Sequence, residues 1–122
     1  MRRRLFPVLA AALAVGLPAL AQAQSRLDFS LVNRTGYEIN EVYLGPSSSS
    51  SWGNDVLGQD TLPNGRSVDI QFNRRASTCS WDMKVVYADG DQSEWRGLDL
   101  CTISKVTLFW NRQSNTTRAV TE

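Results

Sequence analysis

Short runs of alternating apolar and polar residues, separated by turn signals, are the feature that most constrains how this 122-residue chain folds. In residues 79–87 one face would carry Cys79, Trp81, Met83, Val85 and Tyr87, and the other Ser80, Asp82 and Lys84. A period of two puts successive side chains on opposite faces of a strand, so this run predicts a strand with one buried and one solvent-facing side. No long helical periodicity accompanies these runs.

Similar alternation predicts strands within 27–32, 37–44, 68–72, 92–100, 105–110 and 116–121. The parity of the second run changes near Asn40–Glu41, which predicts a β-bulge there. Asp89–Gly90 is a strong hairpin signal, and in the irregular segment 45–65 either Asn54 or Asp55 is expected to cap a single helical turn. Six or seven short antiparallel strands in about 100 residues predict an all-β fold, a single small β-sandwich, with a small β-barrel as the alternative.

The N-terminal segment has the three parts of a secretory signal peptide. Residues 2–4 are all arginine, residues 5–20 carry no charge, and Ala21-Gln22-Ala23 offers small residues at the cleavage site. We expect cleavage after Ala23, leaving residues 24–122 as one β-sandwich domain without a membrane span. The early Arg3–Arg4 pair favours a Sec-type over a twin-arginine signal, and the predicted location is the periplasm or the medium.

Two cysteines, Cys79 and Cys101, lie in the predicted exported part. An even number of cysteines in an oxidising compartment predicts a disulfide bond. Closing a loop of this length would stabilise the fold by about 3 kcal/mol. Two buried free thiols are the alternative.

Charge and composition exclude several classes of function. Three of the 13 basic residues are in the signal peptide, so residues 24–122 carry ten basic and 12 acidic residues, a net charge of −2 without a basic patch. Nucleic-acid binding is therefore not expected. The chain has no histidine, which removes histidine-activated nucleophiles and the usual zinc and copper ligand sets. We expect no cofactor and no enzyme activity.

Carboxylates, lysine, tyrosine and serine remain for catalysis, and the carboxylates occur in candidate pairs. Asp89 with Asp91, or Asp55 with Asp60, would be the pairs of a small carboxylate-based hydrolase. The same four aspartates are the candidate ligands of a calcium-dependent β-sandwich module, because calcium prefers several oxygen ligands. The structural alternative is that Asp55 caps a turn and Asp89 forms the hairpin.

Aromatic residues suggest recognition instead. The predicted inward faces hold Trp81 and Trp110, whereas Trp52 and Trp95 lie in or beside loops. A ligand-binding loop would therefore use Trp52, Asp55 and Trp95, unless Trp52 folds back to hold the long loop in place. Loops on a rigid sandwich commonly carry function, so segment 45–65 and the 88–96 hairpin are the expected recognition elements.

Three groups of residues together resemble a known protein family. They are Asn33-x-Thr35-Gly36, Trp52-Gly53-x-Asp55-x-Leu57 and Cys79-x-Trp81-Asp82. The chain resembles a family of small exported bacterial all-β proteins of unknown function, some labelled as twin-arginine-signal or argininosuccinate-lyase proteins. The resemblance implies an exported all-β domain. The lyase label does not suit this chain, because such lyases resemble large helical tetramers.

The sequence thus predicts an exported, monomeric, non-enzymatic binding or interaction module. Its partner would be an envelope or extracellular protein, a peptide or a glycan. The sequence does not identify that ligand.

Overall fold

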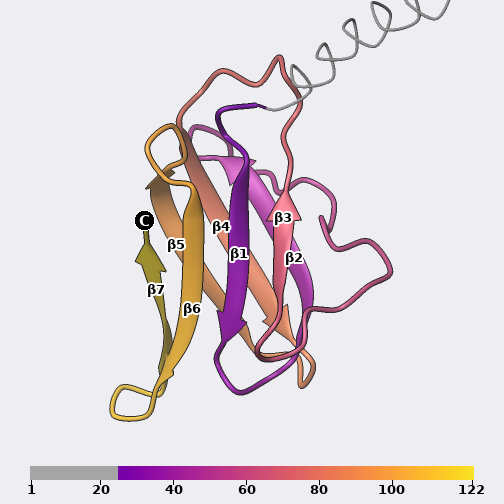
Figure 1. Cartoon of the computed structure of the whole chain (residues 1–122), viewed down its shortest axis with the longest axis vertical. Helices are drawn as coiled ribbons and strands as arrows, with labels where there is room; N and C mark the ends of the chain where they lie inside the picture. Colours follow the sequence, from indigo (N-terminus) through magenta and orange to yellow (C-terminus); the bar gives the residue numbers. More distant parts are fainter. Residues whose placement is uncertain (1–24) are drawn as a thin grey trace, which may run out of the picture.

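Seven strands form two facing sheets, as Figure 1 shows. The structure is a computed structural model that describes residues 25–122; the predicted signal peptide lies outside the described residues. The strands are β1 (Phe29–Arg34), β2 (Ile39–Pro46), β3 (Ser67–Ile70), β4 (Ser80–Tyr87), β5 (Gln92–Asp99), β6 (Lys105–Asn111) and β7 (Thr116–Thr121). Every predicted strand is present, and residues 25–122 contain no helix.

One sheet has the strand order β3-β1-β6-β7 and the other β2-β4-β5. Because they remain two separate sheets, the fold is the predicted β-sandwich rather than the alternative barrel. The prediction of antiparallel pairing needs one correction, since β1 and β6 run parallel. This pairing brings the end of β1 beside the end of β6, with Arg34 opposite Phe109.

The core lies between the sheets and consists mainly of inward side chains that the alternation predicted, with Leu57 and Leu62 added from the long loop. Leu31, Val42, Met83 and Leu108 are among its fully buried members, and each belongs to a different strand. The predicted bulge is confirmed, because the register of β2 on β4 shifts between Ile39 and Glu41. The shift keeps both Ile39 and Val42 buried although they are three residues apart.

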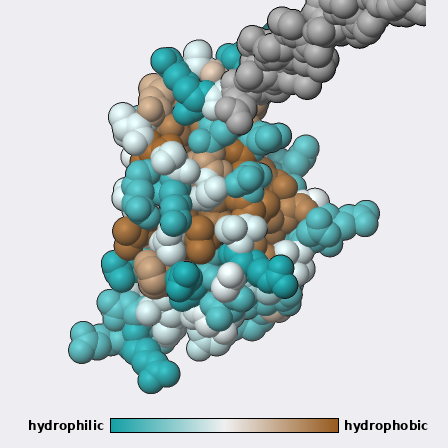
Figure 2. Space-filling model, in the orientation of Figure 1, coloured by the Kyte–Doolittle hydropathy of each residue, from teal (hydrophilic) through white to brown (hydrophobic). Residues whose placement is uncertain are grey.

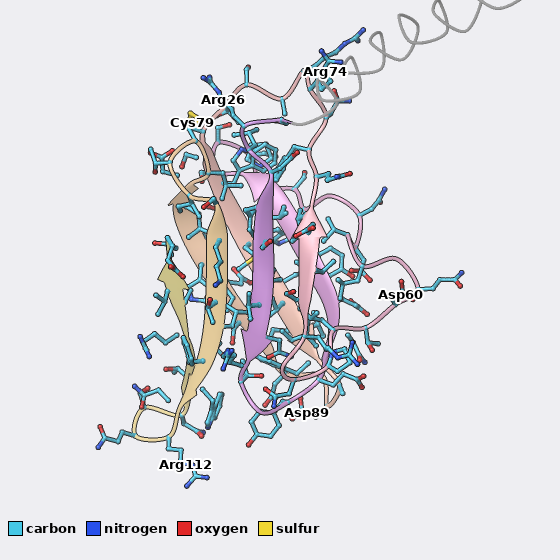
Figure 3. All side chains as sticks on the ribbon, in the orientation of Figure 1. Arg26, Asp60, Arg74, Cys79, Asp89 and Arg112 are labelled. Atoms are coloured by element: carbon cyan, nitrogen blue, oxygen red, sulfur yellow. A yellow bond between two sulfur atoms is a disulfide. The ribbon has the colours of Figure 1, made fainter. Side chains whose placement is uncertain are left out.

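The predicted disulfide is also present, and it joins Cys79 to Cys101 with Cα atoms 5.2 Å apart. It links the residue before β4 to the loop after β5, at the upper end of the molecule in Figure 3. Trp81 packs against the core nearby, and its ring meets that of Phe72 at 4.9 Å in an edge-on arrangement.

Three connections gather at the opposite end of the sandwich (Figure 1): the β1–β2 turn, the β4–β5 hairpin and the β6–β7 hairpin. Asp89–Gly90 forms the tip of the β4–β5 hairpin as predicted, and Gly90 has the positive φ of 92° that such turns require. On the face shown in Figure 2, hydrophobic residues gather at mid-height, whereas this lower end is mainly hydrophilic. No helix in the described range is long and apolar enough to span a membrane.

Candidate functional site

An open cleft of about 600 Å³ lies at the end where the three connections meet. It separates the ends of the two sheets, because its walls come from the β1–β2 turn, the β4–β5 hairpin and the start of β7. Its principal side chains are Tyr37, Glu38, Tyr87, Asp89, Asp91, Ser93, Glu94, Trp110 and Thr117. The volume falls within the usual range of small-ligand pockets.

Two aromatic rings form one rim of the cleft. The centroids of the Tyr37 and Trp110 rings are 5.7 Å apart, with planes at 79°, a favourable edge-to-face geometry. Tyr37 is 55% exposed, which is unusual for so large a side chain in this domain. The prediction that Trp110 belongs to the core is wrong, because this half-buried side chain lies outside the core cluster and lines the cleft at the open end.

The floor of the cleft is a set of hydroxyl groups. Tyr87 and Thr117 are buried, and their hydroxyl groups are hydrogen-bonded to each other. The Ser93 hydroxyl donates to Thr117 Oγ1 at 3.3 Å. Three hydroxyl groups share these two bonds, so the floor retains both donor and acceptor capacity toward the cleft.

The cleft is negatively charged. Its lining contains four carboxylates, Glu38, Asp89, Asp91 and Glu94, and no lysine or arginine. Glu94 forms an ion pair with Arg96 at 2.9 Å. The other three form no ion pair with any described residue. Within the lining of the cleft their charge is therefore not balanced by a basic side chain.

Asn33 builds the turn that presents Tyr37. This side chain is fully buried, and its amide nitrogen donates to the Tyr37 carbonyl oxygen at 2.7 Å and to the Leu62 carbonyl oxygen at 2.9 Å. Its amide oxygen accepts from the backbone N–H and the hydroxyl group of Thr35. The Asn33-x-Thr35-Gly36 motif thus forms a polar network that reaches Tyr37 and Leu62, and it fixes the backbone position of the cleft rim.

The long loop between β2 and β3 lies elsewhere, along the free edge of β2. Its Gly53 and Val56 N–H groups donate to the carbonyl oxygens of Leu44 and Val42, so the loop pairs with the edge strand. Asp55 Oδ1 accepts from the N–H groups of Val42 and Leu57. The predicted capping contact is present, but the segment forms a turn rather than a helical turn.

Trp52 folds back over the outer face of the β2-β4-β5 sheet. The Lys84 ammonium lies 5.2 Å from the centroid of its ring and the Arg96 guanidinium 5.9 Å, both within cation–π distance. Trp95, in contrast, pairs with Met83 and packs against the core from the inner face of the same sheet. Trp95 therefore lies on the opposite face of this sheet from Trp52, and none of the three residues Trp52, Asp55 and Trp95 lines the cleft.

The two pairs of aspartates considered for calcium or hydrolysis lie on different parts of the molecule, whereas Asp89 and Asp91 stay together beside the cleft. Asp60 lies on the side loop and Asp89 at the hairpin end, as Figure 3 shows. Asp89 Oδ1 accepts from the Asp91 N–H at 2.9 Å, which is the expected hairpin contact. Among residues 25–122, the one group of three or more side chains close enough to share a metal ion is Asp99 with Cys79 and Cys101, and both cysteines are in the disulfide.

The prediction that Asp82 faces solvent on the outer face of β4 is wrong, because this side chain is buried. Its Oδ1 accepts from the Ser47 hydroxyl at 2.7 Å and from the Gly97 N–H at 2.9 Å, and Arg96 pairs with Oδ2 at 3.1 Å. The register of β5 shifts beside Asp82, and Gly97 has a φ of 68°. The bond from Gly97, with those from Ser47 and Arg96, lowers the pKa of the Asp82 carboxyl below its ordinary value.

Asp82→Asn is expected to destabilise the protein at neutral pH, because the amide cannot pair with Arg96. A carboxyl whose pKa is lowered by folding stabilises the protein above its unfolded pKa of about 3.9, and that contribution disappears as the pH falls through the lower folded pKa. Thermal melts between pH 2 and pH 7 should therefore show a gap between wild type and variant that closes in acid. A gap independent of pH would contradict this role.

Comparisons with known proteins support the fold and identify no family. No family model and no curated protein matches the chain. The chain is similar in fold to a protein from Eubacterium rectale solved by NMR, with a TM-score of 0.56 and 13% sequence identity. The match covers 83% of this chain and 90% of the other. At this identity the similarity supports the sandwich architecture, and the family resemblance remains a prediction.

Proposed function

We propose that this protein is an exported, non-enzymatic binding module that recognises its ligand in the cleft at the hairpin end. The signal-peptide pattern of residues 1–23 supports export to the periplasm or the medium. The ligand is a peptide, protein or glycan of the cell envelope or its surroundings. The observation that carries the proposal is the exposed Tyr37 ring, held against Trp110 at the rim of a 600 Å³ cleft.

The construction of the rim supports a role in binding. Tyr37 follows a turn whose backbone is fixed by the buried Asn33 side chain, so the ring is presented from a rigid support. Preorganised aromatic side chains bind with little loss of conformational entropy and are common at the centre of binding surfaces. Of the two expected recognition elements, the β4–β5 hairpin lines this cleft and the long loop does not.

The carboxylates support binding rather than catalysis. In this histidine-free chain the carboxylate pairs are the candidates for proton transfer, and one member of each pair already has a structural role. Asp55 joins the long loop to β2, and Asp89 forms the hairpin turn. A binding module needs no further chemistry from them.

The test is to probe arrays of peptides and envelope glycans with the purified protein and two variants. Tyr37→Ala removes the exposed ring, and we expect it to weaken binding of the wild-type ligands about tenfold or more, as loss of a large aromatic contact can. Val56→Ala is the matched control, because Val56 is the other large exposed hydrophobic residue, at 43%, and lies outside the cleft. It should bind as wild type does.

Three results would overturn the proposal. The first is an array on which the wild type binds nothing. The second is a ligand that Tyr37→Ala retains and Val56→Ala loses. The third is chemical conversion of an array member, which would identify an enzyme. Melting curves of both variants establish that each is folded.

A further inference from the structure

We propose that the cleft binds a cationic side chain, the ammonium group of lysine or the guanidinium group of arginine, presented by a peptide. This inference rests on the proposed function and names the class of its ligand. In the bound state the alkyl chain lies along the Tyr37 and Trp110 rings, and the charged group lies among the carboxylates beyond them.

The distribution of charge is the first argument. Glu38, Asp89 and Asp91 are unpaired with any cation of the described chain and line a hollow without basic residues. A hollow of one sign focuses its field and attracts ligands of the opposite sign. A cationic group entering here would meet three negative charges and no competing positive one.

The opposite side of the aromatic pair has the reverse polarity. Tyr37 and Trp110 also line a second hollow, whose charged residues are Arg34 and Arg112 and which contains no carboxylate. The rings therefore stand between an acidic hollow and a basic one. This polarity favours a ligand that places its cation on the side of Asp89 and Asp91 only.

The aromatic and hydroxyl groups supply the remaining contacts. Lysine and arginine bury their alkyl chains along apolar surfaces while the charged group stays in a polar environment, and the two rings offer such a surface. An ammonium has three N–H donors and no acceptor, so it needs several oxygens around it. The hydroxyl oxygens of Tyr87 and Ser93 on the floor and the carboxylates on the walls provide acceptors of this kind.

The strands beside the cleft favour a peptide over a small free amine. β5 is an edge strand of one sheet and β7 is an edge strand of the other. Ser93 of β5 and Thr117 of β7 both line the cleft, so it opens beside two strand edges. Edge strands have unpaired backbone N–H and C=O groups, with which an extended peptide can form hydrogen bonds.

The test is an NMR titration of the purified, isotope-labelled protein with three acetylated and amidated hexapeptides. They alternate glycine with lysine, with glutamine or with glutamate, and spermidine is added as a free amine. We expect the lysine peptide to bind best, with shifts centred on residues 87–94 and 115–117, and salt to weaken it. Spermidine should bind more weakly, because it has no backbone to pair with the edge strands.

Two variants connect the binding to the cleft. Glu38→Gln with Asp91→Asn removes two exposed charges, and we expect it to weaken the lysine peptide about fivefold or more. Arg34→Gln is the matched control on the other side of the rings and should bind at least as tightly as wild type. Because all three positions are exposed, the variants should fold normally.

The outcomes separate this inference from the proposed function. Equal binding of the glutamine and lysine peptides, lost in Tyr37→Ala, would support the cleft as a site and overturn its preference for cations. Spermidine binding as tight as that of the lysine peptide would overturn the assignment to a peptide. Lysine-peptide binding that survives the double substitution, or no binding of any probe, would overturn the inference, while the array decides the proposed function independently.

Discussion

Replacement of Asn33 by aspartate is expected to lower the free energy of unfolding by about 3 to 5 kcal/mol at pH 7. The two side chains have nearly the same shape, but the amide nitrogen of Asn33 donates to the carbonyl oxygens of Tyr37 and Leu62. In the variant a carboxylate oxygen would face those two acceptors in a fully buried site. The measurement is chemical denaturation of wild type and variant at several pH values.

The pH dependence of the stability of Asn33→Asp tests whether a buried carboxylate causes the destabilisation. Burial favours the neutral acid, so the pKa of the new carboxyl should rise on folding, and the destabilisation should grow as the pH increases from about 4 to neutral. Asn64→Asp is the matched control, because the Asn64 side-chain oxygen accepts from the Gly36 N–H at an exposed position. It should change stability by less than about 0.5 kcal/mol. Similar losses in both variants would contradict a special role for Asn33.

This prediction also concerns the proposed site, because Asn33 holds the carbonyl oxygen of Tyr37 and thereby the rim of the cleft. We expect Asn33→Asp to weaken ligand binding even in solutions where the variant is folded. The Asn33-x-Thr35-Gly36 motif thus connects stability to recognition. In the structure a side-chain network within the motif rigidifies the turn that it forms.

The strands were predictable because each is specified by its own residues. Alternation along 79–87 is a local signal, and Met83, Val85 and Tyr87 are buried on one face as a period of two requires. The bulge beside Asn40 was predictable for the same reason, since a change of parity must be accommodated in the strand where it occurs. The disulfide pairing was predictable because the chain contains only two cysteines.

The cleft was not predictable, because residues far apart in the sequence create it. The rim places Tyr37 beside Trp110 only because β1 and β6 pair in parallel, and no local pattern encodes that pairing. Asp82 shows the same limit. The alternation along β4 predicted a solvent-facing Asp82 side chain. In the structure Ser47, Arg96 and Gly97, which come from other segments, bind and cover it. The sequence located the hairpin wall of the cleft at Asp89 and Asp91, but not its aromatic rim.

Reduction of the Cys79–Cys101 disulfide is expected to cost about 3 kcal/mol, within a usual range of 2 to 5 kcal/mol. The bond closes a loop with a sequence separation of 22, and this loop contains β4 and β5. Without it the unfolded chain gains conformational freedom, whereas the sandwich keeps its core. For a domain of this size the melting temperature should fall by more than about 10 °C. Thermal melts with and without reductant measure the change.

The double variant Cys79→Ala with Cys101→Ala supplies the control. It should melt at the temperature of the reduced wild type and should not respond to reductant. Intact mass of the oxidised protein recovered after export should correspond to a chain beginning at Gln24 and lacking two hydrogen atoms. A mass that retains residues 1–23 would contradict export with cleavage, and an unchanged melting temperature on reduction would contradict a stabilising role of the bond.

The disulfide and the cleft lie at opposite ends of the sandwich, so reduction should affect stability and leave ligand binding unchanged. Cys79 lies at the end of the sandwich opposite Asp89, as Figure 3 shows, and the bond lines no part of the cleft. Below its lowered melting temperature, the reduced protein should therefore bind the lysine peptide as tightly as the oxidised protein does. A parallel loss of binding and stability would mean that the two ends of the sandwich are coupled. Unchanged binding would instead indicate that Asn33 and the hairpins hold the cleft without support from the disulfide end.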